Sequence, residues 1–180
     1  MVASDDTVAW RRRLPHLQRR ERTYFLTFCT EKRHELSPAA RDVAMACVLH
    51  DSGLTYYLIE VVVMPDHVHM IFQPFDFSLQ TILGRIKGVS SRLINEVTGR
   101  SGRLWQGEYF DRILRRDEDI RKKAEYVAAN PVRAGLVESP DQYRWLWRWW
   151  NAEDQQRWRD EIVRGILSGA RATSPAPSRR

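Results

Sequence analysis

The sequence predicts an α+β domain of the ferredoxin-like kind, in which helices pack on one face of an antiparallel sheet. Two observations lead to this fold class. Segments with strand and helix patterns follow one another in the order β-α-β-β-α-β-α, which is the order of a split βαβ motif. The chain of 180 residues also has the length of one domain and can bury a substantial core, because 43% of its residues are hydrophobic.

Composition and capping residues mark the first strand and the first helix. Residues 23–30 (TYFLTFCT) are rich in β-branched and aromatic side chains, which are typical of a strand. Residues 37–53 predict a helix, because Ser37 can cap its start, Pro38 fits its first turn and Gly53 follows its end.

A hairpin, a long helix and a last strand–helix pair follow. Residues 55–74 (TYYLIEVVVMPDHVHMIFQP) indicate two strands, because the proline in the middle disfavours one continuous central strand. Apolar residues recur at helical spacing over residues 79–97, and Gly99 follows. Residues 103–116 alternate in part, which favours a strand. Residues 117–131 predict a helix that begins near an aspartate and ends at a proline.

The charge balance favours an anionic partner. There are 29 Lys and Arg against 23 Asp and Glu, for a formal net charge of +6. Arginine suits phosphate because its planar guanidinium donates two hydrogen bonds at once. The two cysteines form no metal-binding pattern, and no run approaches the roughly 20 apolar residues of a membrane span. We therefore expect a cytoplasmic, nucleoid-associated protein with no membrane partner.

Two histidines in the second half of the hairpin are candidate metal ligands. His67 and His69 are two residues apart, and residues at this spacing share one face of a strand. Val68 and Met70 then point to the opposite, apolar face. A single histidine is more often a packed or surface residue than a ligand, but two imidazoles on one face are costly to bury unless they are solvated, hydrogen-bonded or bound to something.

The last helix offers two further candidates. Tyr126 and Asn130 are four residues apart, so they lie on one face of a helix. The amide oxygen of Asn130 can bind a hard metal ion, and the phenol of Tyr126 can act as a nucleophile. The ordinary alternative is a packed tyrosine and an asparagine that ends a helix before a proline.

Two basic clusters are candidate DNA-binding residues, although each could also be a solvated helix face. They are Arg85, Lys87 and Arg92 in the long helix, and Arg115, Arg116, Arg121, Lys122 and Lys123 just before Tyr126.

The chain resembles the REP-associated tyrosine transposases, which are relatives of the single-tyrosine HUH transposases. The segments that carry the resemblance are YFLTF, VVVMPDHVHMIF, IKGVSSRLINE, LWQGEYFDRILRRDED and EYVAANPVRAGLV, in that order, over about residues 22–146. The chain departs from the family's pattern after SPDQYRW, where LWRWW follows.

The resemblance implies a complete site and an activity. His67, His69 and Asn130 would hold a divalent metal, Mg²⁺ or Mn²⁺, and Tyr126 would be the catalytic nucleophile. The strand with the histidines would be central in the sheet. The enzyme would cleave and join single-stranded DNA beside REP-like hairpins through a 5′-phosphotyrosine, as a monomer or a homodimer.

We divide the chain into a basic N-terminal arm (1–22), a catalytic domain (23–150) and a polar C-terminal helix with a disordered tail (151–180). The tryptophans of the YRWLWRWW segment could stack on unpaired bases, but packing in the core or in an oligomer is the more common use of tryptophan.

Two other kinds of activity fit the residues. One is a metal-dependent nucleic-acid hydrolase that forms no covalent intermediate. The other is a non-catalytic nucleic-acid-binding domain, because ferredoxin-like sheets often bind RNA through aromatic residues.

Overall fold

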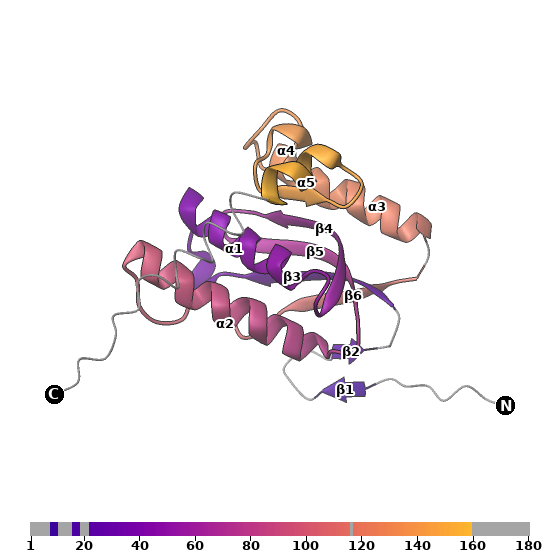
Figure 1. Ribbon diagram of the computed structural model, residues 1–180, viewed down its shortest axis with the longest axis horizontal. Helices are drawn as coiled ribbons and strands as arrows, with labels where there is room; N and C mark the ends of the chain where they lie inside the picture. The colour runs from indigo at the N-terminus through magenta and orange to yellow at the C-terminus, as the bar shows by residue number, and fades with distance from the viewer. Residues whose placement is uncertain (1–7, 11–15, 19–21, 116, 160–180) are drawn as a thin grey trace.

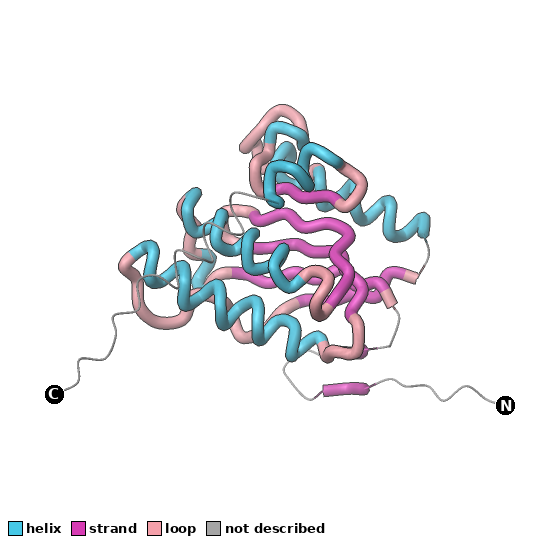
Figure 2. Tube along the Cα trace, viewed as in Figure 1, coloured by secondary structure: helices cyan, strands magenta, loops and turns pink. Residues whose placement is uncertain are grey.

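A five-stranded antiparallel sheet forms the centre of the molecule. The computed structural model describes residues 8–10, 16–18, 22–115 and 117–159. The strands stand in the order β6-β3-β5-β4-β7, and every neighbouring pair is antiparallel. Their bounds are Thr23–Cys29 (β3), Tyr56–Val63 (β4), His67–Pro74 (β5), Phe110–Leu114 (β6) and Leu146–Arg148 (β7). The predicted ferredoxin-like fold is confirmed, with β7 as an added edge strand and β5 in the centre (Figures 1 and 2).

Two long helices cover one face of the sheet. They are α1 (Pro38–Asp51) and α2 (Leu79–Thr98), and each begins at a serine whose hydroxyl oxygen accepts a backbone N–H, as expected for an N-cap. Gly99 ends α2 with a left-handed backbone, φ 66°, which glycine adopts without steric cost. The apolar residues of α1 and α2 pack with the inward residues of β3, β4 and β5 in the larger core.

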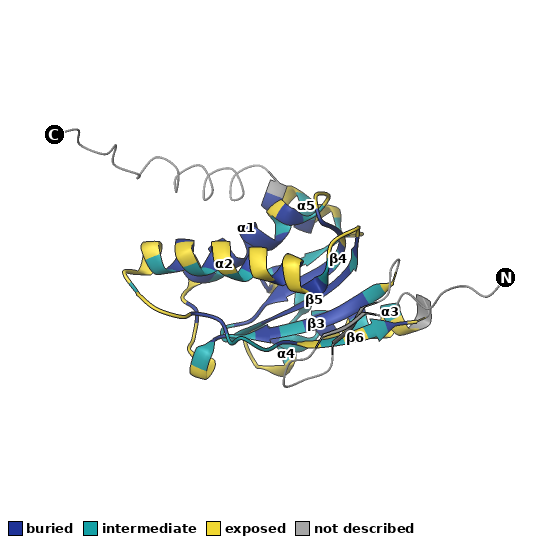
Figure 3. Ribbon diagram, turned by 90° about the horizontal axis from the view of Figure 1, so that it is seen from below, coloured by how far each residue is buried: buried dark blue, intermediate teal, exposed yellow. Residues whose placement is uncertain are grey.

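The prediction that all helices lie on one face is wrong for α3 (Asp117–Ala128), which packs on the opposite face (Figure 3). The physical reason is that this second face also carries apolar side chains. Phe25 and Ile71 form a smaller core there with Ala124 and Val127 of α3. Leaving those side chains in water would lose roughly 25 cal/mol for each Å² of apolar surface.

The C-terminal part of the described chain adds short elements around the edge strand. The helix predicted to end at Pro131 ends earlier as α3, and a short helix α4 (Asn130–Arg133) contains the proline. Helix α5 (Ala152–Arg159) packs near β7, and the short 3₁₀ helices η1 (Glu31–Arg33) and η2 (Pro140–Gln142) lie in connections.

Within the predicted N-terminal arm, β1 (Val8–Trp10) pairs with β2 (His16–Gln18). Most of the predicted tail lies outside the described residues, and the division into domains stays a prediction.

The tryptophan-rich segment divides between packing and solvent. Trp145 and Trp147 are partly buried against the cores, whereas about half of Trp149 and Trp150 is exposed. None of the helices in the described ranges is both long and apolar enough to cross a membrane.

Candidate functional site

Two imidazole rings lie side by side on the α3 face of the central strand. His67 and His69 are in β5, and their ring centroids are 4.6 Å apart. The alternation of the strand separates them from Val68 and Met70, which are buried in the core on the other face. The expected arrangement of two rings on one face is therefore present.

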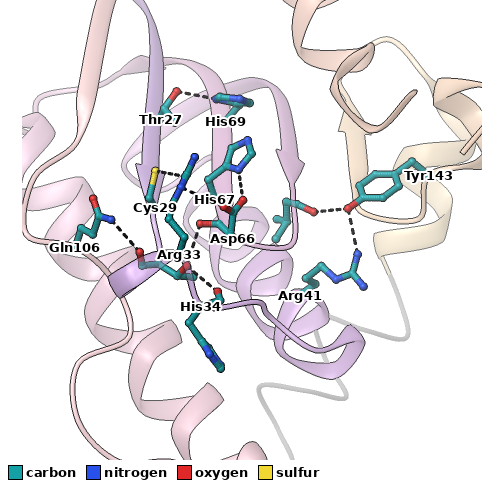
Figure 4. Close-up of polar contacts among 12 residues, drawn as sticks. Thr27, Cys29, Arg33, His34, Arg41, Asp66, His67, His69, Gln106 and Tyr143 are labelled. Carbon is teal, nitrogen blue, oxygen red and sulfur yellow. Dashed lines mark hydrogen bonds and ion pairs between the residues drawn. The ribbon is translucent and has the colours of Figure 1, made fainter. Parts of the chain in front are cut away.

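Each imidazole has a polar partner at its Nδ1 atom. Nδ1 of His67 donates to a carboxylate oxygen of Asp66 at 2.6 Å. Nδ1 of His69 shares a hydrogen bond with the hydroxyl of Thr27 at 2.7 Å, across the pair of strands β3 and β5 (Figure 4). With both Nδ1 atoms engaged, Nε2 is the atom that each ring can offer to a metal, and such outer partners are typical of metal-binding histidines.

The environment of His69 keeps its imidazole neutral. Burial lowers its pKa to about 3, and the neighbouring His67, Lys123 and Arg33 act in the same direction. A neutral imidazole has the lone pair that a metal ion requires, so His69 needs no deprotonation at neutral pH before it can bind one.

Tyr126 lies beside this pair, and two cations lie close to its ring. Its ring centroid is 6.4 Å from that of His69, and 40% of the residue is exposed. The ammonium of Lys123 lies 4.6 Å from the centroid of the Tyr126 ring, and the guanidinium of Arg133 lies 4.8 Å from it. These contacts favour a fixed ring and place positive charge near the phenol.

Asn130 is tied to the end of α3. Its side-chain amide N–H groups donate to the backbone carbonyls of Tyr126 at 2.8 Å and of Val127 at 3.2 Å. The donor side of the amide is thereby used within the protein, and the amide oxygen is the atom left to bind a cation.

These side chains offer donor atoms of the kind that binds a divalent cation. They are the Nε2 atoms of the two imidazoles, which lie together on β5, and the amide oxygen of Asn130, which lies at the end of α3 one helix turn after Tyr126. Among the described residues no cluster of three or more His, Cys, Asp or Glu could hold a metal, so a cation bound by the two imidazoles would take a further donor of another kind. Nitrogen and oxygen donors without thiolate suit Mg²⁺ or Mn²⁺ better than a structural zinc.

The predicted basic residues separate into two regions. Lys123 lies at the site, over the rings of Phe25 and Tyr126. Arg121 and Lys122 are exposed on α3, Arg115 is exposed just after β6, and Arg116 lies outside the described residues.

The cluster in α2 lies on the other face of the sheet from the histidines. Arg85 donates to the carboxylate of Asp51, and its Nε lies 3.1 Å from Oδ2. The Lys87 ammonium donates to the carbonyls of Gln106, Gly107 and Glu108. Arg92 is exposed, and its Nη1 atom lies 3.9 Å from Oε2 of Glu96. The structure therefore does not bring these three residues together with the histidine pair.

The sequence interpretation missed four residues around the site. They are Thr27 and Asp66, which bind the imidazoles, Arg33, whose Nε lies 3.2 Å from the Asp66 carboxylate, and Arg133. Asp66 could have been found, because a carboxylate beside a candidate ligand is a common outer partner. The place of Thr27 depends on the register of β3 against β5, which local sequence does not give.

A metal ion held by His67 should bind more weakly when the Asp66 carboxylate is lost. Asp66→Asn keeps the shape of the side chain but removes the charged acceptor for Nδ1 of His67. Outer-partner mutations commonly reduce metal affinity about 10- to 100-fold. Titration with Mn²⁺ in a calorimeter measures this, with Asp76→Asn as a control at an exposed aspartate. Equal affinity of Asp66→Asn and the wild type would contradict the role given to Asp66.

The structure belongs to the class of α+β proteins with a ferredoxin-like sheet, and here the sheet carries two histidines side by side with a tyrosine next to them. Comparison with known proteins gives the family. The family model described as "Transposase IS200 like" matches residues 19–130, which is more than half of the chain. The chain belongs to this transposase family, as its sequence predicted.

Two individual proteins are similar to this chain. A curated REP-associated tyrosine transposase of Haemophilus influenzae (strain ATCC 51907 / DSM 11121 / KW20 / Rd) is 24% identical over 91 residues, which is 44% of this chain and 52% of the relative. The chain thus matches about half the length of that relative. A solved structure of a REP-associated tyrosine transposase bound to a REP hairpin has a TM-score of 0.61 and 18% identity, over 93% of this chain and 89% of the other. At this identity the structural similarity shows the fold.

Proposed function

We propose that this protein is a metal-dependent strand transferase that cleaves single-stranded DNA beside a hairpin through a 5′-phosphotyrosine. The observation that carries the proposal is the contact of Tyr126 with the histidine pair, at 6.4 Å between the rings of Tyr126 and His69. Membership of the transposase family supports DNA as the substrate. The similar structure that holds a REP hairpin supports a hairpin as the recognised element.

The chemistry assigns one role to each group. The phenol of Tyr126 loses its proton as its oxygen attacks phosphorus, and a P–O bond to tyrosine forms while the bond to the 3′ oxygen breaks. The 3′ oxygen takes up a proton and leaves as a free 3′-hydroxyl. A divalent cation held by His67, His69 and Asn130 would offset negative charge on the scissile phosphate. Lys123 and Arg133 add fixed positive charge beside the reacting phenol.

The covalent link conserves the energy of the phosphodiester bond. A second 3′-hydroxyl can therefore attack the phosphotyrosine, re-form a P–O3′ bond and release the phenol, without an external energy source. The two basic surfaces, on α3 and on α2, would bind the DNA on opposite faces of the sheet. Both a monomer and a homodimer are compatible with this proposal.

The direct test of this function is the formation of a covalent adduct. A pool of DNA hairpins with randomised single-stranded flanks is incubated with the protein and Mg²⁺ or Mn²⁺, and the products are separated on a denaturing gel. We expect a protein–DNA band that EDTA prevents and that protease removes. Cleavage without any covalent band would contradict the proposal.

Lys123 should contribute more to the reaction than its neighbour Lys122. Lys123 lies over the rings of Phe25 and Tyr126, whereas Lys122 is exposed on the same helix. We expect Lys123→Ala to reduce the cleavage rate about 10- to 100-fold, because it removes fixed positive charge from the site. Lys122→Ala should mainly weaken binding to all sequences alike and flatten the salt dependence. Single-turnover cleavage and binding at several salt concentrations measure the two effects, and equal effects of both changes would contradict this assignment.

A further inference from the structure

An exposed aromatic ring lies on the histidine face of the sheet and has no role in the site described above. Phe110, at the start of β6, is 54% exposed. It pairs with Thr27 of β3, and Thr27 in turn pairs with His69 of β5. Residues directly opposite in neighbouring strands project to the same face, so Phe110, Thr27 and His69 form one row across the sheet.

Ring contacts connect Phe110 with the histidines. The centroid of the Phe110 ring is 6.3 Å from that of Phe25 in an edge-on arrangement, and the centroid of Phe25 is 5.4 Å from that of His69. Lys123 lies above Phe25, with its ammonium 4.6 Å from the ring centroid. Phe25 is therefore covered, whereas Phe110 presents its ring to solvent at the end of the row.

A basic side chain accompanies the exposed ring. Arg112 is two residues after Phe110 in β6 and pairs with Phe25, so it projects to the same face and is also exposed. The intervening Asp111 points to the other face. An open aromatic ring beside a guanidinium is the combination that binds a single-stranded nucleotide, because the base stacks on the ring and the guanidinium pairs with phosphate.

We propose that Phe110 and Arg112 form a binding site for one unpaired nucleotide next to the scissile phosphate. The base stacks on Phe110, and Arg112 pairs with the phosphate of the same nucleotide. This inference rests on the proposed function for the identity of the strand. The charge of the surroundings agrees with an anionic occupant, because Lys123 lies over both Tyr126 and Phe25, the residue that pairs with Arg112.

An exposed phenylalanine on an edge strand could instead contact a second copy of the chain. A protein interface would leave Arg112, on the same face as the ring, without the phosphate that the proposal gives it. The test below therefore includes the molecular mass of the protein in solution.

The test measures base stacking in a variant that cannot cleave the DNA. In the Tyr126→Phe background, which cannot form the adduct, a DNA hairpin selected from the randomised pool carries the fluorescent base 2-aminopurine at one unpaired position at a time. Stacking on an aromatic ring quenches this fluorescence. We expect quenching at one flanking position to disappear with Phe110→Ala and to persist with Phe110→Tyr. The matched control is Phe75→Ala, because Phe75 is 46% exposed and directly follows Pro74, the last residue of β5.

The same variants separate this inference from the proposed function. With Tyr126 intact, Phe110→Ala and Arg112→Ala should each lower the adduct yield at limiting DNA about tenfold, and an abasic site at the quenched position should remove the effect of Phe110→Ala. If the wild type forms the adduct but quenching at no flanking position depends on Phe110, the inference is overturned and the proposed function stands. Phe110-dependent quenching without any adduct from the wild type would overturn the proposed function alone. A change of sedimentation mass in Phe110→Ala with unchanged quenching would show a protein interface instead.

Discussion

Tyr126→Phe should abolish DNA cleavage and the covalent adduct while leaving hairpin binding nearly intact. The change removes one oxygen and keeps the ring, so the ring contacts with Lys123, Arg133 and His69 remain available. Because 40% of the residue is exposed, the folding cost is small. We expect a loss of rate on the order of 10⁴-fold or more, which is the range found when a nucleophile is removed.

Tyr126 and His67 have different roles in the proposed reaction, so replacing each of them should have a different effect. The phenol acts only by forming the bond to phosphorus, so the proposed reaction stops when its oxygen is removed. His67→Ala should also abolish cleavage, but for a different reason, because it removes an atom that holds charge at the phosphate. Tyr126→Phe should therefore retain Mn²⁺ binding, whereas His67→Ala should lose it.

A matched control and a gel assay make this prediction decisive. Tyr57→Phe removes the hydroxyl of another partly exposed tyrosine, in β4, and should cleave at the wild-type rate. Cleavage and adduct are measured on denaturing gels, binding by fluorescence anisotropy and folding by circular dichroism. Near wild-type cleavage by Tyr126→Phe would reject the tyrosine mechanism and favour a metal-dependent hydrolase.

The order of elements and the histidine pair could be predicted because both depend on local sequence. Periodicity, caps and proline positions placed β3, α1, α2 and the β4–β5 hairpin close to their observed bounds. The spacing of His67 and His69 determines their common face as soon as the segment is a strand.

The positions of the basic residues could not be predicted in the same way. A helix pattern shows which residues are buried but not which face of the sheet the helix covers. The sequence therefore indicated two basic clusters, with Arg85 and Lys87 in one and Lys123 in the other, but not that α2 and α3 place them on opposite faces of the sheet. The apolar side chains of Phe25 and Ile71 were the available signal that the second face also needed a covering helix.

Glu60 is the residue whose environment is least evident from the sequence. In the run YYLIEVVV it resembles a solvent-facing position, yet it is fully buried. An irregularity in the pairing between Leu58 and Glu60 shifts the alternation of β4. The added strand β7 then pairs Glu60 with Arg148. Both of these features depend on tertiary contacts.

The buried carboxyl of Glu60 should make folding stability fall as the pH rises. Neither of its oxygens has a hydrogen-bond partner in the described part of the chain. Arg148 is engaged by Asp141 and Asp154, at 2.7 Å each. Burial raises the pKa of Glu60 to about 9, against the opposing effect of Arg148. Between about pH 4.5 and pH 9 the unfolded chain loses this proton while the folded protein keeps it, so the free energy of unfolding decreases through that range.

Glu60→Gln should remove this pH dependence, because the amide has a similar shape and does not ionise. The variant should match the wild type near pH 4.5 and become progressively more stable than the wild type as the pH rises toward 9. Urea unfolding at pH 5 and pH 8 measures the difference, and the opposite contribution of His69 cancels because both proteins contain it. Glu138→Gln, which removes an exposed carboxyl, controls for the loss of one charge. If the wild type and Glu60→Gln lose stability in parallel between the two pH values, Glu60 is not the proton-binding group inferred here.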